Sequence, residues 1–174
     1  HATIRPFAMT EEEAANAPES TKFTAKPVIK TNYKFTMAVS PLDCMGCTLC
    51  VKACPVNNKA AKDGTAKVAI KMVPQETQAD QQAAWNYCVA NVSEKPELIN
   101  NTVKGSQFKQ PLLEFSGSCA GCAETSYARL ITQLFGERMY ISNATGCSSI
   151  WGGSAPATPY TVNKESGRGP AWAN

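Results

Sequence analysis

The chain has 174 residues, of which 43% are apolar, and its 17 basic and 14 acidic side chains leave a formal net charge of +3. This is enough material for one domain, or for parts of two, with a core of ordinary size. The charge is too nearly balanced, and the lysines and arginines too dispersed, to indicate nucleic-acid binding, and no run of 18 apolar residues is present that could span a membrane.

Both ends of the chain lack the features of a natural terminus. The first residues, beginning at His1, include neither an initiator Met nor the apolar stretch of a signal peptide. The last residues, up to Asn174, contain no terminal feature either. We therefore expect the chain to be an internal stretch of a longer protein.

The N-terminal half is expected to contain short elements of both kinds. Residues 11–27 are polar and predict an exposed helix start followed by a connector. Residues 34–42 carry β-branched and aromatic side chains and lead into the first cysteines. In 66–72 apolar residues and lysines occupy opposite faces, which predicts a half-exposed strand that ends at Pro74. Residues 76–91 are rich in Gln and Ala and predict a helix with a weak apolar face.

The C-terminal half follows a stretch, 93–111, whose prolines and scattered polar residues indicate a domain boundary. A helix is predicted over 124–135, because four apolar residues have the i, i+3, i+4, i+7 spacing, and Gly136 is a suitable stop. A short strand is predicted over 138–143, and the tail from Gly152, rich in Gly, Ser and Pro, is expected to be an irregular arm. The apolar face of the helix consists of Tyr127, Leu130, Ile131 and Leu134.

The eight cysteines decide the class of protein. They are too crowded to pair with their neighbours in unstrained disulfides, which favours ligands of a metal centre in a reducing interior. Cys88 stands alone beside Trp85 and Tyr87 in a predicted helix, and we expect it to be a small buried apolar residue rather than a ligand. The candidate metal ligands are Cys44, Cys47, Cys50, Cys54, Cys119, Cys122 and Cys147.

The first four of these cysteines have the spacing C-x₂-C-x₂-C-x₃-C-P, which ends at Pro55. Two-residue gaps let the thiolates wrap around one cubane cluster, and Gly46 lets backbone amides approach the inorganic sulfides. A structural zinc site is the alternative, but it generally takes two cysteines from one place and two from another. The spacing therefore predicts a [4Fe-4S] cluster.

In two-cluster ferredoxins the fourth cysteine of such a run ligates the other cluster. By this rule Cys54 belongs to a second cluster, whose remaining ligands would lie upstream of His1. The ligands of the first cluster within the chain would be Cys44, Cys47 and Cys50.

A second constellation combines the pair Cys119 and Cys122 with Cys147, 25 positions later. A C-x₂-C pair is compatible with a cluster, a zinc ion or a thioredoxin-like redox couple. The residue types alone leave these alternatives open.

The segments 113–125, 131–139, 143–152 and 169–172 resemble the start of the thiamine-diphosphate domain of pyruvate:ferredoxin oxidoreductases. Together with the ferredoxin motif, the resemblance covers nearly the whole chain in the right order. One departure is Ala123, which stands where the family frequently has glycine in Cys-x-Gly-Cys-Gly-Glu.

This resemblance implies that Cys119, Cys122 and Cys147 ligate the cluster nearest the cofactor, with a fourth ligand downstream. It places the loop Gly146-Cys147-Ser148 near the thiamine diphosphate and lets Glu124 approach it. No catalytic residue is expected in the chain, because the family's pyruvate, magnesium–diphosphate and coenzyme A sites lie in other parts of the sequence.

The implied fold class is α+β / α/β. Residues 1–92 would be the C-terminal part of a two-cluster ferredoxin-like domain with a trailing helix. Residues 93–110 would be a linker, and 111–174 would begin an α/β domain that binds thiamine diphosphate.

The implied function is oxidative decarboxylation of pyruvate to acetyl-CoA and CO₂, with thiamine diphosphate, Mg²⁺ and coenzyme A, and with electrons passing through [4Fe-4S] clusters to ferredoxin or flavodoxin. The complete enzyme would be a homodimer in the cytoplasm, or in a hydrogenosome-like organelle of an anaerobic protist, and this stretch alone would be inactive. The alternatives are a ferredoxin-type electron carrier, a zinc-stapled module, and a related oxidoreductase that uses another 2-oxo acid or feeds NADP through a fused reductase.

Overall fold

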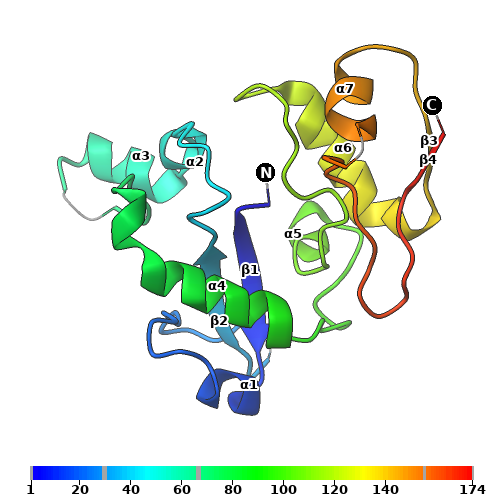
Figure 1. Ribbon diagram of the computed structural model, residues 1–174. Helices are drawn as coiled ribbons and strands as arrows, with labels where there is room; N and C mark the ends of the chain where they lie inside the picture. Colours follow the sequence, from blue (N-terminus) through cyan, green and yellow to red (C-terminus); the bar gives the residue numbers. More distant parts are fainter. Residues whose placement is uncertain (1, 29–30, 66–67, 155, 174) are drawn as a thin grey trace.

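The protein, seen in a computed structural model, forms two neighbouring halves, each with a two-stranded sheet (Figure 1). The described residues are 2–28, 31–65, 68–154 and 156–173. The strands are β1 (Ile4–Met9), β2 (Lys34–Val39), β3 (Tyr140–Ser142) and β4 (Ala171–Ala173). This mixed α/β architecture agrees with the predicted fold class. None of the helices in the described ranges is long and apolar enough to cross a membrane.

The N-terminal sheet pairs β1 with β2 in antiparallel register, from Ile4 opposite Val39 to Met9 opposite Lys34. Helix α1 (Glu11–Ala15) follows β1 directly and lies in the polar stretch where a helix start was predicted. A capping box begins it: Glu13 N donates to Thr10 Oγ1 at 3.1 Å, and Thr10 N donates to a Glu13 carboxylate oxygen at 2.8 Å.

Helix α4 (Ala79–Asn91) packs across this sheet and closes the main core. Phe7 of β1 meets Trp85 of α4 edge to face, with ring centroids 6.3 Å apart. Cys88, one turn after Trp85 on α4, is fully buried in the same cluster. The prediction that Cys88 is a small buried apolar residue is therefore confirmed.

The cysteine-rich segment forms short helices, and the strand predicted over 66–72 does not form in its described part. Residues 66 and 67 lie outside the described residues, and 68–72 form no strand. The side chain of Asn57 takes the place of a partner strand. Its Oδ1 accepts from the Ala69 N–H at 2.9 Å, and its Nδ2 donates to the Ile70 carbonyl at 2.6 Å. The elements here are α2 (Leu49–Ala53), α3 (Pro55–Lys62) and the 3₁₀ turn η1 (Gln75–Thr77).

The predicted linker, 93–110, is packed against both halves and contains α5 (Val103–Ser106). Lys95 Nζ lies 2.9 Å from a carboxylate oxygen of Glu13 in the N-terminal half. Gln133, buried on the next helix, donates to the carbonyls of Ser106 and Lys109 at 2.9 and 2.7 Å. Whether the segment separates two domains stays a prediction.

The C-terminal half begins with α6 (Ala123–Phe135) and the 3₁₀ turn η2 (Gly136–Arg138), followed by β3 as predicted. The helix forms where it was predicted, but its four apolar side chains do not form a buried face. Tyr127 and Ile131 are 67% and 49% exposed, whereas Thr132 and Gln133 are buried. The Thr132 hydroxyl and the Gln133 amide nitrogen donate to backbone carbonyls, and an apolar periodicity does not register such bonds. Gly136 does not have a left-handed backbone. Glycine fits this position because a β-carbon there would lie only 2.9 Å from Leu112 Cδ1.

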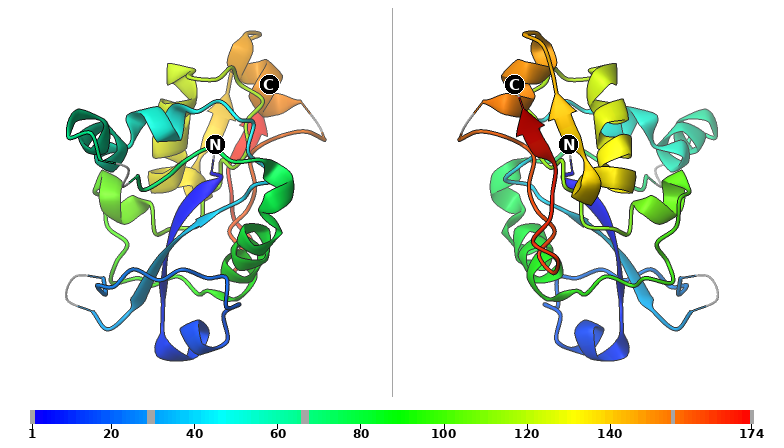
Figure 2. Two further views of the ribbon diagram at one scale, coloured as in Figure 1. Left: turned by 90° about the vertical axis from the view of Figure 1, so that its left-hand side faces the viewer. Right: turned by 90° about the vertical axis from the view of Figure 1, so that its right-hand side faces the viewer.

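Between α7 and β4 the described part of the tail forms no helix or strand, as expected of an irregular arm, but its two ends do. Gly152 and Gly153 belong to helix α7 (Cys147–Gly153), and a β-carbon on Gly153 would come within 2.7 Å of the Trp172 indole. Trp172 lies in β4, which pairs in parallel with β3 (Figure 2). The two consecutive glycines thus leave room for the bulky indole. The residues in contact are about twenty positions apart, so no local sequence pattern indicates the contact.

Candidate functional site

A large cavity, about 1150 Å³ in volume, lies between the loop that leads into α2 and the loop that precedes α6. Sulfur-bearing side chains from both loops line it, although the loops are far apart in the sequence. The cysteines on its wall are Cys44, Cys47, Cys50, Cys119 and Cys122. Apolar side chains such as Ile4, Val39 and Leu49 complete the wall. The fold therefore brings two of the predicted ligand sets to one space.

The first loop is shaped by two residues with left-handed backbone. Gly46 has φ +68° and Thr48 has φ +63°. Glycine adopts this conformation freely, whereas at Thr48 it costs about 1–2 kcal/mol. Such strain in a non-glycine residue concentrates at functional sites. The turns leave Cys44 and Cys47 exposed and place Cys50, on α2, half-buried beside them.

The second loop presents its thiols at the start of a helix. The Cys122 N–H donates to the Cys119 carbonyl at 3.0 Å, and Gly121 between them has φ +79°. Hydrogen bonding from the Thr125 side chain, and from the backbone N–H groups of Thr125 and Glu124, lowers the pKa of the Cys122 thiol. The thiolate is the form that ligates metals.

All the predicted ligands are free thiols, which fits a centre bound by thiolates. Five of the seven line the cavity. Among the described residues, no three Cys, His, Asp or Glu side chains form a group that could hold a single metal ion. The loop conformations and the N–H groups near Cys122 are the features that a cluster with negatively charged sulfur requires.

Two predicted ligands stand apart from this cavity. Cys54 is half-buried at the junction of α2 and α3, and Cys147 is exposed at the first residue of α7. Neither belongs to the described residues that line the cavity. Two assignments therefore remain predictions. One places Cys54 in another cluster, and the other places Cys147 in the cluster of Cys119 and Cys122.

The residues predicted to lie near thiamine diphosphate are at the N-terminal ends of two helices. Gly146 precedes α7, where its N–H donates to Ser149 Oγ at 3.1 Å. Asn143 Nδ2 donates to Ser148 Oγ at 2.5 Å and fixes the same loop. Glu124 is exposed in the first turn of α6.

The ring of Tyr160 packs on α7 and is affected by the charge of Glu124. Burial raises the pKa of Tyr160, and the negative charge of Glu124 raises it further, so Glu124 acts on this ring. Tyr160 in turn stacks on Trp151 of α7 at a centroid distance of 6.5 Å.

Arg129 on α6 also lines the large cavity, a position that the cysteine pattern does not indicate. The signal was available, because Arg129 follows Cys122 by seven residues, two turns of a helix.

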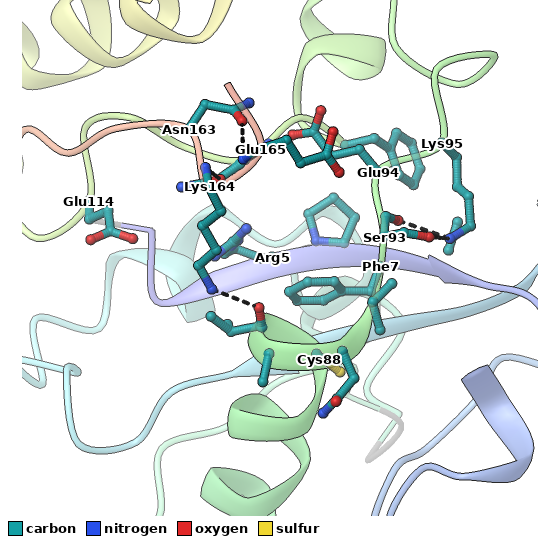
Figure 3. A pocket seen from close by; sticks show the side chains of 18 residues that line it. Arg5, Phe7, Cys88, Ser93, Glu94, Lys95, Glu114, Asn163, Lys164 and Glu165 are labelled. Carbon is teal, nitrogen blue, oxygen red and sulfur yellow. Dashed lines mark hydrogen bonds between the residues drawn. The ribbon is translucent and has the colours of Figure 1, made fainter. Parts of the chain in front are cut away.

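A second cavity of about 300 Å³ lies at the junction of the two halves (Figure 3). Arg5 lines it, with its guanidinium 5.1 Å from the centroid of the Phe7 ring. Lys164 Nζ donates to the Val89 carbonyl at 3.0 Å and ties the C-terminal tail to α4. Burial raises the pKa of the nearby Cys88 thiol to about 11, which keeps the thiol protonated. This junction has the character of a packed seam rather than a metal site.

Comparison with known proteins identifies a 4Fe-4S binding domain at residues 37–58, which includes all four cysteines of the first motif. The whole chain is 51% identical over 175 residues to the pyruvate-flavodoxin oxidoreductase of Enterobacter agglomerans. It is 52% identical over 178 residues to the pyruvate:ferredoxin oxidoreductase of Moorella thermoacetica, and it spans 14% of the length of each. A pyruvate dehydrogenase [NADP(+)] of Cryptosporidium parvum is 48% identical over 179 residues, and the chain spans 8% of it.

Proposed function

The chain is a relative, over its whole length, of one segment of the pyruvate:ferredoxin and pyruvate-flavodoxin oxidoreductases, and from this premise we propose that it is an electron-transfer segment of an enzyme that oxidises pyruvate. The complete reaction would convert pyruvate and coenzyme A to acetyl-CoA and CO₂, releasing two electrons and a proton. The observation that carries the proposal is the shared cavity, where cysteines of the ferredoxin-type motif face cysteines of the second constellation.

The thiolates divide between clusters in this proposal. Cys44, Cys47 and Cys50 hold one [4Fe-4S] cluster, and Cys54 belongs to a neighbouring one. Cys119, Cys122 and Cys147 hold a third. A bound [4Fe-4S] cluster accepts and passes on single electrons. The protein supplies thiolates, backbone N–H groups near the sulfur atoms, and apolar walls that limit the access of water.

The C-terminal half, from residue 111, is proposed as the start of the domain that binds thiamine diphosphate with Mg²⁺. When bound, this cofactor supplies the electron sink for decarboxylation. Gly146, Cys147 and Ser148 would face it, and Glu124 would approach it from α6. The enzyme would work as a homodimer in the cytoplasm or a hydrogenosome-like organelle. Ferredoxin or flavodoxin would accept the electrons.

A second candidate for the final acceptor is NADP. The relative from Cryptosporidium parvum, with 48% identity, is named a pyruvate dehydrogenase [NADP(+)]. The cysteine sites of the chain would serve equally in either enzyme, because the acceptor differs only after the clusters.

The test uses the full-length protein, purified anaerobically, with quantitation of iron, acid-labile sulfide and zinc and with EPR before and after pyruvate plus coenzyme A. We expect iron and sulfide in multiples of about four per chain and EPR signals that appear on adding both substrates. Zinc without sulfide would exclude the cluster sites. Clusters that stay oxidised with pyruvate but respond to another 2-oxo acid would reassign the substrate.

A further inference from the structure

Arg129 places a positive charge on the wall of the cavity that the five cysteines share. It follows Cys122 by seven residues and Thr125 by four, so all three lie on one face of α6. Seven residues correspond to about 10 Å along the helix axis. Both Arg129 and Cys122, the residue that caps α6, line the cavity.

The packing of α6 holds this guanidinium in a defined place. Arg129 Nη2 donates to Gln107 Oε1 at 3.3 Å. The segment that carries Gln107 is itself fixed to α6, because Gln133 donates to the carbonyls of Ser106 and Lys109. Burial lowers the pKa of Arg129, yet arginine stays protonated at any physiological pH. The charge is therefore permanent and largely withdrawn from water.

A permanent charge at this position acts on any centre in the cavity. A cluster bound by thiolates is negative, and it becomes more negative when it accepts an electron. A nearby positive charge in a medium of low dielectric stabilises the reduced state more than the oxidised state. Net charge and burial are among the factors that set cluster potentials.

We propose that Arg129 raises the reduction potential of the cluster ligated by Cys119 and Cys122, and so favours the passage of electrons from the thiamine cofactor into the chain of clusters. This inference rests on the proposed function, since it requires a cluster at that pair. Arg129 is a tuning residue in this role: it neither ligates the cluster nor contacts the substrate.

The test is an EPR-monitored redox titration of the full-length protein with its clusters, for the wild type, Arg129→Gln, Arg129→Lys and Arg138→Gln. Arg138 is exposed on η2 and is a matched control for the loss of one positive charge. We expect Arg129→Gln to lower one midpoint potential. At a fixed potential the ratio of reduced to oxidised cluster should fall about tenfold, equal to 59 mV for one electron. Arg129→Lys and Arg138→Gln should stay near the wild type.

A second variant covers the case in which Arg129→Gln fails to assemble its clusters. Gln107→Glu places a carboxylate next to the intact guanidinium and offsets its field, so it should lower the same midpoint potential. If neither variant lowers a midpoint further than Arg138→Gln does, with iron and sulfide at wild-type levels, the inference is wrong while the proposed function stands. A wild-type protein without iron and sulfide would instead overturn the proposed function itself.

Discussion

Leu49 and Gly121 lie against each other where the two cysteine loops meet: a β-carbon built on Gly121 would be 3.8 Å from Leu49 Cδ1. Leu49 lies between Cys47 and Cys50, and Gly121 lies between Cys119 and Cys122. The Leu49 side chain of one ligand loop thus points at the backbone of the other.

The first prediction concerns the backbone of Gly121. Its φ of +79° is a conformation that residues other than glycine rarely adopt. Gly121→Ala has room for its methyl group, so its cost comes from the backbone and should be about 1–2 kcal/mol. We expect a lower melting temperature and less iron bound per chain, because relaxation of the loop moves Cys119 and Cys122. Gly117→Ala is the control: it has open space and no left-handed backbone. Equal iron content and melting temperature in both variants would contradict the prediction.

The sequence predicted the parts of this protein that depend on local spacing. The intervals between Cys44 and Cys54 indicated a cluster site, and the helices around Trp85 and Leu130 were found approximately where the patterns placed them. Spacing could not show that Cys119 faces the first cysteine loop, because that contact depends on how the two halves pack. Nor could it show Trp172 against Gly153, a contact across a long connection.

The second prediction concerns Asn57, whose side chain replaces the missing partner strand of residues 68–72. Asn57→Ala leaves the Ala69 N–H and the Ile70 carbonyl without their side-chain partner. We expect a loss of about 1–3 kcal/mol and faster hydrogen exchange at the amides of residues 69 and 70. Asn58→Ala, at the exposed neighbouring position, should change neither quantity. Unchanged exchange at residues 69 and 70 in Asn57→Ala would show that another group satisfies this backbone.

The third prediction concerns Glu13, which receives hydrogen bonds from Lys95, Ser93 and Thr10. Burial disfavours its charged form, but these hydrogen bonds outweigh burial and lower the pKa of Glu13 from 4.5 to about 2. A carboxyl group whose pKa is lower in the folded state than in the unfolded state stabilises the protein at pH values above the unfolded-state pKa. That stabilisation is lost as the pH falls from about 4.5 toward 2.

Glu13→Gln should therefore lower the free energy of unfolding by about 2 kcal/mol at pH 7. The difference from the wild type should narrow as the pH falls below 4.5, where the wild-type carboxylate also becomes protonated. Urea unfolding of both proteins between pH 7 and pH 3 measures this difference. Glu11→Gln, exposed in the same turn, is the control and should cost little at any pH. A difference that stays constant with pH would mean that the network is not electrostatic.

The fourth prediction separates the buried cysteine from the ligands. Cys88 is fully buried against Phe7 and Trp85, and burial raises the pKa of its thiol to about 11. Cys88→Ala should keep the iron and sulfide content of the wild type and lose about 1 kcal/mol of stability, the cost of a small cavity. Cys50→Ala should instead lose iron and sulfide from one cluster, because Cys50 lines the shared cavity. Loss of iron in Cys88→Ala at an unchanged melting temperature would make Cys88 a ligand. Retention of all clusters in Cys50→Ala would remove Cys50 from the ligand set.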